Sequence, residues 1–227
     1  DIDEHTYNIC PEALAERIED IAGNGELTPR AIIAVDLFGL PADYTRITPL
    51  AEEHGLVLIE DAAQSFGGAL GDRKACSFGA MAATSFFPAK PLGCFGDGGA
   101  VFTSDDSLAE KIRSLRVHGK GKDKYDNIRI GLNSRLDTLQ AAILLAKIAE
   151  LPAELEARQR WADEYSARLQ DEFIVPQVPG DMRSAWAQYT IRPREGGRET
   201  YLQRLAGNGV PSAIYYGKPL HLQPAFA

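Results

Sequence analysis

LVLIEDAAQSFG, at residues 56–67, is the stretch that decides the fold, because a short apolar run ends there in two acidic residues. Such a run is typical of a buried strand, and it would deliver Glu60 and Asp61 to the strand's carboxyl end. In open parallel sheets the ligand crevice lies at these carboxyl ends. The small residues after Asp61 would let a ligand approach the backbone, whereas an Asp at such a place can equally cap a following helix through Gln64. Both interpretations of Asp61 stay open at this point.

A second apolar run lies upstream, AIIAV at 31–35, and fits a strand buried on both faces. Between the two runs, Thr48 as N-cap and Pro49 at the first helical position predict the start of a helix. Two strands joined by one helix form a right-handed βαβ unit with parallel strands. The predicted fold class is therefore α/β with a mostly parallel sheet.

The rest of the chain continues this alternation and then changes character. We expect a large domain over residues 1–150, and over residues 151–227 a linking helix with part of a smaller α+β domain. The elements expected are helices at 11–21, 105–117 (with Ser104 as N-cap), 136–151, 152–170 and 198–205, and strands at 82–87, 99–103, 189–191 and 212–215.

A lone lysine between two prolines stands in TSFFPAKPLG at 84–93. The flanking prolines restrict the backbone, which would hold the stem of Lys90 in a fixed direction. Apolar surroundings favour an uncharged, nucleophilic amine. Such surroundings are predicted here by the neighbours Phe86, Phe87, Leu92 and Phe95. The competing interpretation is an ordinary solvated loop lysine.

Asp61 and Lys90 together indicate more than either does alone. Pyridoxal phosphate needs a lysine for its Schiff base and an acid against its pyridine nitrogen. Ser85, five residues before Lys90, could donate a hydrogen bond to the phosphate. A nicotinamide-binding protein is rejected, because the glycines at 93–96 do not form the GxGxxG pattern. The residues therefore predict an enzyme that uses pyridoxal phosphate.

Four short motifs follow one another along the chain, at residues 60–67, 84–90, 96–100 and 131–137. In order and spacing they resemble the DegT/DnrJ/EryC1/StrS family of sugar aminotransferases, over essentially the whole chain. The resemblance implies the fold-type I architecture of pyridoxal-phosphate-dependent transferases. It also implies a fragment, since relatives carry a segment with a Gly-Thr turn upstream of the part seen here and a longer end of the small domain.

The resemblance assigns roles to residues around the cofactor. Lys90 would form the Schiff base and then move the proton of the 1,3-shift, and Asp61 would pair with the pyridinium nitrogen. Gln64 would lie against the ring near its hydroxyl, and Ser85 would bind the phosphate. Asn133 would reach the cofactor phosphate of the neighbouring subunit, which implies a homodimer with shared active sites.

The resemblance also suggests residues on the substrate side, namely Tyr216, His221 and Arg135. Arg135 could bind substrate anions or brace its own loop, and His221 could equally be a structural histidine. Many relatives have His-Tyr where this sequence has Tyr215 and Tyr216.

Within the family, two stretches of sequence are most informative, the one around Lys90 and NSRLDTLQAAIL at 133–144. They most resemble the sequences of enzymes that aminate UDP-linked 3-keto-N-acetylated hexoses or hexuronates for surface polysaccharides such as lipopolysaccharide. The implied reaction is transamination with glutamate as donor. The alternatives are an aminotransferase for a dTDP-linked 3- or 4-keto-6-deoxysugar, a sugar dehydratase of the same fold, and a binding module without activity. The presence of Lys90 argues against the last two.

Composition excludes several other classes. The chain is 44% hydrophobic and 25% charged, as in an ordinary globular protein. Its net charge of −8 disfavours a nucleic-acid or anionic-membrane surface. No apolar stretch approaches the ~20 residues that span a bilayer, and the acidic start is unlike a signal peptide, so a cytoplasmic protein is expected. Cys10, Cys76 and Cys94 form no CxxC pair, which predicts reduced thiols and no metal or iron–sulfur site.

Overall fold

The structure is a computed structural model and describes residues 1–123 and 125–226. The chain divides into two compact units. The first contains Asp1–Ala162 and Gln177–Tyr189, and the second contains Asp163–Pro176 and the residues from Thr190 onward. The division falls within helix α5 (Leu151–Leu169), the helix expected to link the two parts of the chain.

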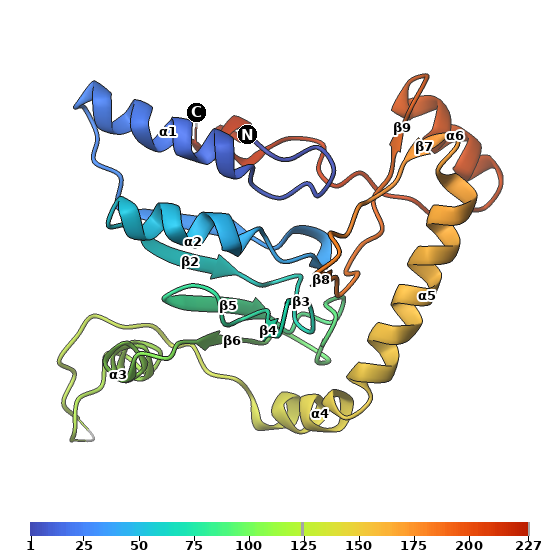
Figure 1. Ribbon diagram of the computed structural model, residues 1–227. Coiled ribbons are helices and arrows are strands. Elements are labelled where there is room, and N and C mark those ends of the chain that lie inside the picture. The colour runs from blue at the N-terminus through green and yellow to red at the C-terminus, as the bar shows by residue number, and fades with distance from the viewer. Residues whose placement is uncertain (124, 227) are drawn as a thin grey trace. The chain divides into compact units, whose positions relative to one another are not determined.

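The first unit is built on a sheet with the strand order β1-β2-β5-β6 (Figure 1). Strands β1 (Ala31–Val35), β2 (Val57–Asp61) and β5 (Met81–Ser85) are parallel, and β6 (Gly99–Phe102) pairs antiparallel with β5. The sheet is thus mostly parallel, and the predicted α/β class is confirmed.

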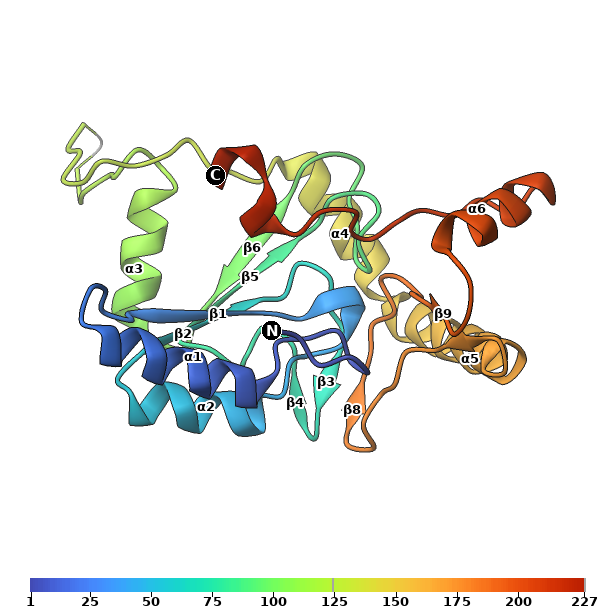
Figure 2. The ribbon, with the colours of Figure 1, turned by 90° about the horizontal axis from the view of Figure 1, so that it is seen from above.

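Helices α1 (Pro11–Asn24) and α2 (Tyr44–Glu53) lie side by side in Figures 1 and 2 and cover one face of this sheet. The core on this face contains Ile18, Ile32, Ala34, Ala42, Tyr44, Ile47, Ala51, Leu58, Leu70 and Phe78. On the opposite face, Ile33 and Val57 are 62% and 46% exposed. The expectation of strands buried on both faces is therefore wrong for the described residues, because side chains alternate along a strand and α1 and α2 pack against one face only.

The start of α2 differs from the prediction. The helix begins at Tyr44, and Pro49 lies inside it rather than at its first position. Tyr44 and Ile47 are almost completely buried, and the Tyr44 ring stacks on Phe78 with centroids 4.4 Å apart. Burial of this first turn outweighs the backbone hydrogen bond that Pro49 cannot donate.

The other elements of the first unit are short or lie beside the sheet. Helix α3 (Asp106–Leu115) has Asp105 as its N-cap rather than Ser104, since Oδ1 of Asp105 accepts the N–H groups of Ser107 (2.7 Å) and Leu108 (3.1 Å). Along the described helices, none combines the length and apolar character needed to cross a bilayer. The remaining elements are η1 (Leu37–Gly39), β3 (Ala69–Leu70), β4 (Arg73–Lys74), α4 (Thr138–Ile148) and β8 (Met182–Arg183).

The second unit contains the end of α5, a two-stranded antiparallel sheet and a further helix. Strands β7 (Phe173–Ile174) and β9 (Arg192–Pro193) pair with each other, and Phe173 packs edge-on against Tyr201 of α6 (Arg198–Gly207) with ring centroids 4.9 Å apart. The strand expected at 212–215 is wrong, because the backbone there pairs with no described strand and its side chains are exposed. Short turns η2 (Leu220–Leu222) and η3 (Pro224–Phe226) follow.

Candidate active site

Asp61 and Ser85 lie at the same edge of the sheet. Asp61 ends β2 in register with Ala83 of the parallel neighbour β5, and Ser85 ends β5 two residues further on. At about 3.3 Å per residue, Ser85 lies about 7 Å beyond the level of Asp61. Because register partners and alternate residues share a face, Asp61, Ala83 and Ser85 all project from the face that α1 and α2 do not cover. A carboxyl and a hydroxyl group therefore stand close together at one sheet edge.

The chain turns sharply after Asp61 instead of entering a helix. Oδ1 of Asp61 accepts the N–H of Ala63 at 3.1 Å, so the carboxylate closes this turn and does not cap a helix through Gln64. Gln64 is buried, and its Oε1 accepts the N–H of Phe38 at 2.5 Å. That contact comes from η1, the turn after β1, and it fixes the direction of the Gln64 amide.

Lys90 lies in the tight turn that follows β5. Its N–H donates to the carbonyl of Phe87 at 2.9 Å, and the chain returns so that the N–H of Cys94 donates to the carbonyl of Phe86 at 2.8 Å. The Cys94 thiol, itself buried, also donates to Phe86 at 3.0 Å. These contacts close the segment from Phe86 to Cys94, with Lys90 in its middle and Ser85 directly before it.

The surroundings of Lys90 are only partly as predicted. Phe86 and Leu92 are buried, but Phe87 and Phe95 are 51% and 76% exposed, so the expectation that all four enclose the lysine is wrong. The turn faces the core with one side and solvent with the other, and Lys90 itself is half-buried.

Helix α4 anchors the far end of the lysine turn. Nζ of Lys147 donates to the carbonyl of Gly93 at 2.6 Å, and Oε1 of Gln140 accepts the N–H of Phe95 at 2.8 Å. Neither residue carried a signal in the sequence, because only the folded chain brings residues 140–147 next to residues 93–95.

Three further polar residues behind the edge were given no role by sequence reasoning. Oγ1 of Thr84 donates to the carbonyl of Ala62 at 2.8 Å, which ties β5 to the turn after Asp61. Asp36 and Glu60 are completely buried on the covered side of the sheet. A signal existed for Asp36, which ends an apolar run just as Asp61 does.

Burial controls the ionisation of this acidic pair. It raises the pKa of Asp36 to about 8 and also raises the pKa of Glu60. Glu60 accepts the N–H groups of Cys76 (2.5 Å) and Phe78 (2.8 Å). The charge of Glu60 adds to burial in raising the pKa of Asp36 above neutral, so Asp36 is the carboxyl that holds a proton at neutral pH.

Asn133 and Arg135 lie together in a different place. Nε of Arg135 donates to Oδ1 of Asn133 at 3.0 Å, so Arg135 braces its own loop. Both line an open hollow of about 1020 Å³ between β5, β6, α3 and residues 133–136. Its lining reaches Ala83 and Thr84 but, among the described residues, not the four residues 61, 64, 85 and 90.

Tyr216 and His221 belong to the second unit. Tyr216 is 58% exposed, with its ring edge-on to Tyr215 at 5.3 Å between centroids, and the exposed His221 lies in η2. Their part in binding substrate stays a prediction.

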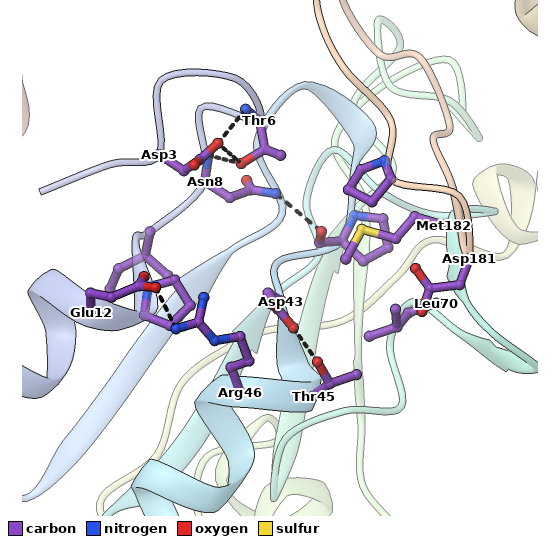
Figure 3. Close-up of a pocket in the computed structure, with 14 residues that line it drawn as sticks. Asp3, Thr6, Asn8, Glu12, Asp43, Thr45, Arg46, Leu70, Asp181 and Met182 are labelled. Carbon is purple, nitrogen blue, oxygen red and sulfur yellow. Dashed lines mark hydrogen bonds and ion pairs between the residues drawn. The ribbon is translucent and has the colours of Figure 1, made fainter.

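A second hollow, of about 320 Å³, lies in the first unit beside the start of α1 and α2 (Figure 3). The carboxylates of Asp3, Glu12, Asp43 and Asp181 line it. Its cation Arg46 donates to Glu12 at 2.5 Å, as the figure shows. This negative lining disfavours the phosphates of a nucleotide sugar. Among the described residues no group of three or more His, Cys, Asp or Glu side chains is arranged to hold a metal ion.

Comparison with known proteins decides the family. The model of the DegT/DnrJ/EryC1/StrS aminotransferase family matches residues 1–227. The chain belongs to this family. Of solved structures, it is similar to a DegT DnrJ EryC1 StrS aminotransferase from Brucella abortus, with a TM-score of 0.96 and 54% identity over 100% of this chain and 60% of that one. The architecture expected from the resemblance, that of fold-type I transferases, is thereby confirmed.

Two further relatives are informative. The chain is 46% identical to the UDP-2-acetamido-2-deoxy-3-oxo-D-glucuronate aminotransferase of Pseudomonas aeruginosa, over 100% of this chain and 61% of that protein. It is 36% identical to S. venezuelae DesV, solved in complex with a ketimine intermediate, with a TM-score of 0.89 over 99% of this chain and 58% of that one. This family member thus spans about three fifths of the length of these relatives.

Proposed function

We propose that the protein is a pyridoxal-phosphate-dependent aminotransferase that moves an amine from glutamate to a UDP-linked 3-keto-N-acetylated hexuronate or hexose, for surface polysaccharide synthesis. The observation that carries this proposal is the placement of Asp61 and Ser85 at the ends of neighbouring parallel strands, with Lys90 in the turn that follows. The similarity to the Pseudomonas aeruginosa uronate aminotransferase supports the choice of sugar.

The polar groups at this edge fit pyridoxal phosphate. They comprise a carboxylate, an amide, a hydroxyl and an amine, which match a pyridine nitrogen, a phenolic oxygen, a phosphate and an aldehyde. Oγ of Ser85 accepts the N–H of Phe87 at 3.2 Å, which leaves its hydrogen to be donated to a phosphate oxygen. Ser85, Asp61, Gln64 and Lys90 would hold the cofactor.

When bound, pyridoxal phosphate supplies an electron sink for a deprotonated substrate carbon. The carboxylate of Asp61 would keep a proton on the ring nitrogen and so strengthen that sink. The amine of Lys90 would take the proton from the amino donor's α-carbon and return it to a neighbouring atom. The hydrogen bond from the Lys90 N–H to the Phe87 carbonyl fixes this turn, which would hold the amine within a short distance of both atoms.

We further propose a homodimer with shared active sites. Asn133 lies in an exposed segment rich in large apolar side chains, which continues onto α4. Exposed apolar patches of this kind mark protein interfaces. The apolar residues concerned are Ile128, Ile130, Leu132, Leu139, Leu145 and Ile148.

The reaction is tested in two steps on the full-length protein. Glutamate alone should convert the bound cofactor to its amino form, seen as loss of the visible absorbance band, and a UDP-linked 3-keto uronate should then restore the band and yield the amino sugar by mass spectrometry. Asp61→Asn, which keeps the shape but not the charge, should slow the glutamate step at least ~100-fold, as expected for a group that stabilises developing charge. If no amino acid changes the band, transamination is the wrong reaction. If only a dTDP-linked keto sugar restores it, the substrate is wrong and the reaction stands.

A further inference from the structure

A contact between two buried polar groups lies directly behind the turn that follows Asp61. Ser65 donates its Oγ hydrogen to Oδ2 of Asp36 at 2.6 Å, and the side chains of both residues are 0% exposed. The alternation of the strands explains this position. Asp61 projects from the open face, whereas Glu60 and Asp36 project into the core on the other side.

The second oxygen of Asp36 is fixed by Tyr44, at the start of helix α2, and by Ala42 just before that helix. Oδ1 accepts the N–H of Ala42 at 2.9 Å and the hydroxyl of Tyr44 at 2.8 Å. Both of these donors belong to the tightly packed core. The carboxyl group therefore has a defined orientation, and through Oδ2 it connects that core to Ser65.

Residues 36–39 contact the turn at three points. Besides the contact with Ser65, the N–H of Asp36 donates to the carbonyl of Asp61 at 3.0 Å, and the N–H of Phe38 donates to Gln64. Of the contacted residues, Asp61 and Gln64 are proposed to face the cofactor, and Ser65 directly follows Gln64. The position of the turn depends on this connection and not only on the sheet.

We propose that Asp36 is a positioning residue that, through Ser65, fixes the turn at 61–65 in the place where Asp61 and Gln64 meet pyridoxal phosphate. The inference rests on the proposed use of that cofactor. Asp36 itself is too deeply buried to touch a ligand, so it acts only through the turn. Loss of the contact with Ser65 lets Gln64 and Asp61 shift, and weakens cofactor binding beyond any effect on the fold.

The test measures cofactor affinity and stability separately in the full-length protein. Apoprotein is titrated with pyridoxal phosphate by absorbance, and the unfolding midpoint of the same apoprotein is measured in urea. Ser65→Ala should weaken cofactor affinity about tenfold, and Asp36→Ala at least as much. Asp36→Asn should restore most of the affinity, because its amide can still bond to the Ser65 hydroxyl.

Tyr44→Phe is the matched control. It removes a hydrogen bond of similar length to the same carboxyl group, but from the core side. It should lower the unfolding midpoint and leave cofactor affinity unchanged. This separates a positioning role from a purely structural one.

The inference is overturned if Ser65→Ala binds the cofactor as tightly as the wild type, or if Tyr44→Phe weakens binding as much as Ser65→Ala does. Ser65→Ala alone decides the matter if Asp36→Ala does not fold. A visible band in the wild type that needs Lys90 shows that the proposed use of pyridoxal phosphate holds even when this inference fails. A wild type that binds no pyridoxal phosphate would overturn both.

Discussion

Asp36 and Glu60 are both fully buried, at the ends of neighbouring parallel strands, on the side of the sheet that faces away from Asp61. The backbone N–H groups of Cys76 and Phe78 stabilise the charge of Glu60, while burial and that neighbouring charge raise the pKa of Asp36, which holds the proton. Two acids placed this close behind a candidate site affect stability in a manner that depends on pH.

The protein should become less stable as pH rises from about 4 to about 8, and Asp36→Asn should reduce this trend. The folded pKa of Asp36 is about 8, above the ~3.9 of an unfolded Asp. The folded state therefore binds more protons in this window, so the free energy of unfolding falls as pH rises. Urea unfolding midpoints at about pH 5 and pH 8 measure the difference, which an unaltered slope in the variant would contradict.

Glu12→Gln is the control for that measurement. Glu12 is exposed, and its hydrogen bond with Arg46 lowers its pKa to about 2. A lowered pKa gives stability that is present above the unfolded pKa and lost as pH falls towards about 2. Replacement of Glu12 by Gln should therefore leave the dependence of the unfolding midpoint on pH unchanged between about pH 5 and pH 8.

Ile47→Ala should destabilise the protein by about 2–5 kcal/mol, because the side chain is 0% exposed and its removal leaves a cavity between α2 and the sheet. Leu27→Ala, at a side chain that is 71% exposed, should change the free energy of unfolding by less than about 0.5 kcal/mol. Denaturant unfolding compares the two. Equal effects would mean that α2 does not form the core described.

Gly39→Ala should be more destabilising than Gly25→Ala. Both glycines have positive φ, +107° and +69°, but a Cβ on Gly39 would lie 2.7 Å from the backbone nitrogen of Trp186, whereas one on Gly25 meets nothing within 4 Å. Gly25→Ala should cost about 1–2 kcal/mol from backbone strain alone. Gly39→Ala adds a backbone clash next to Phe38, so thermal unfolding should show the larger shift in that variant.

Thiol reactivity should separate the three cysteines. Cys10 is half-exposed and should be alkylated first. Burial and the charge of Glu60 raise the pKa of the Cys76 thiol to about 12, so little thiolate forms, and Cys94 is buried. Peptide mass spectrometry after timed alkylation reads the order, with all three reacting alike in urea. Rapid modification of Cys94 in the native protein would contradict the closed lysine turn.

The sequence predicted the parts of the fold that depend on local pattern. The strands expected from the apolar runs at 31–35 and 56–59 and the helix at 198–205 formed nearly as expected, because each pattern is complete within a few residues. The start of α2 could not be predicted, since it depends on Tyr44 stacking on Phe78, a residue far away in the chain. The strand expected at 212–215 failed because β propensity needs a partner strand.

For the candidate site too, the sequence predicted only the residues that a local pattern marks. Asp61, Ser85 and Lys90 stand out because each lies at or just after the end of a strand, and parallel strands bring their ends to one edge. Thr84 and Lys147 were missed, because their roles exist only as contacts with residues distant in sequence. Asp36 was missed although it ends an apolar run, because its contact with Ser65 appears only in the folded chain.

The role of Lys90 is the central claim, and the visible absorbance band of the full-length protein with pyridoxal phosphate tests it most directly. Lys90→Ala should abolish the band, while Lys74→Ala, at an exposed lysine of β4, should leave it intact. A band that persists in Lys90→Ala with unchanged intensity would contradict the account.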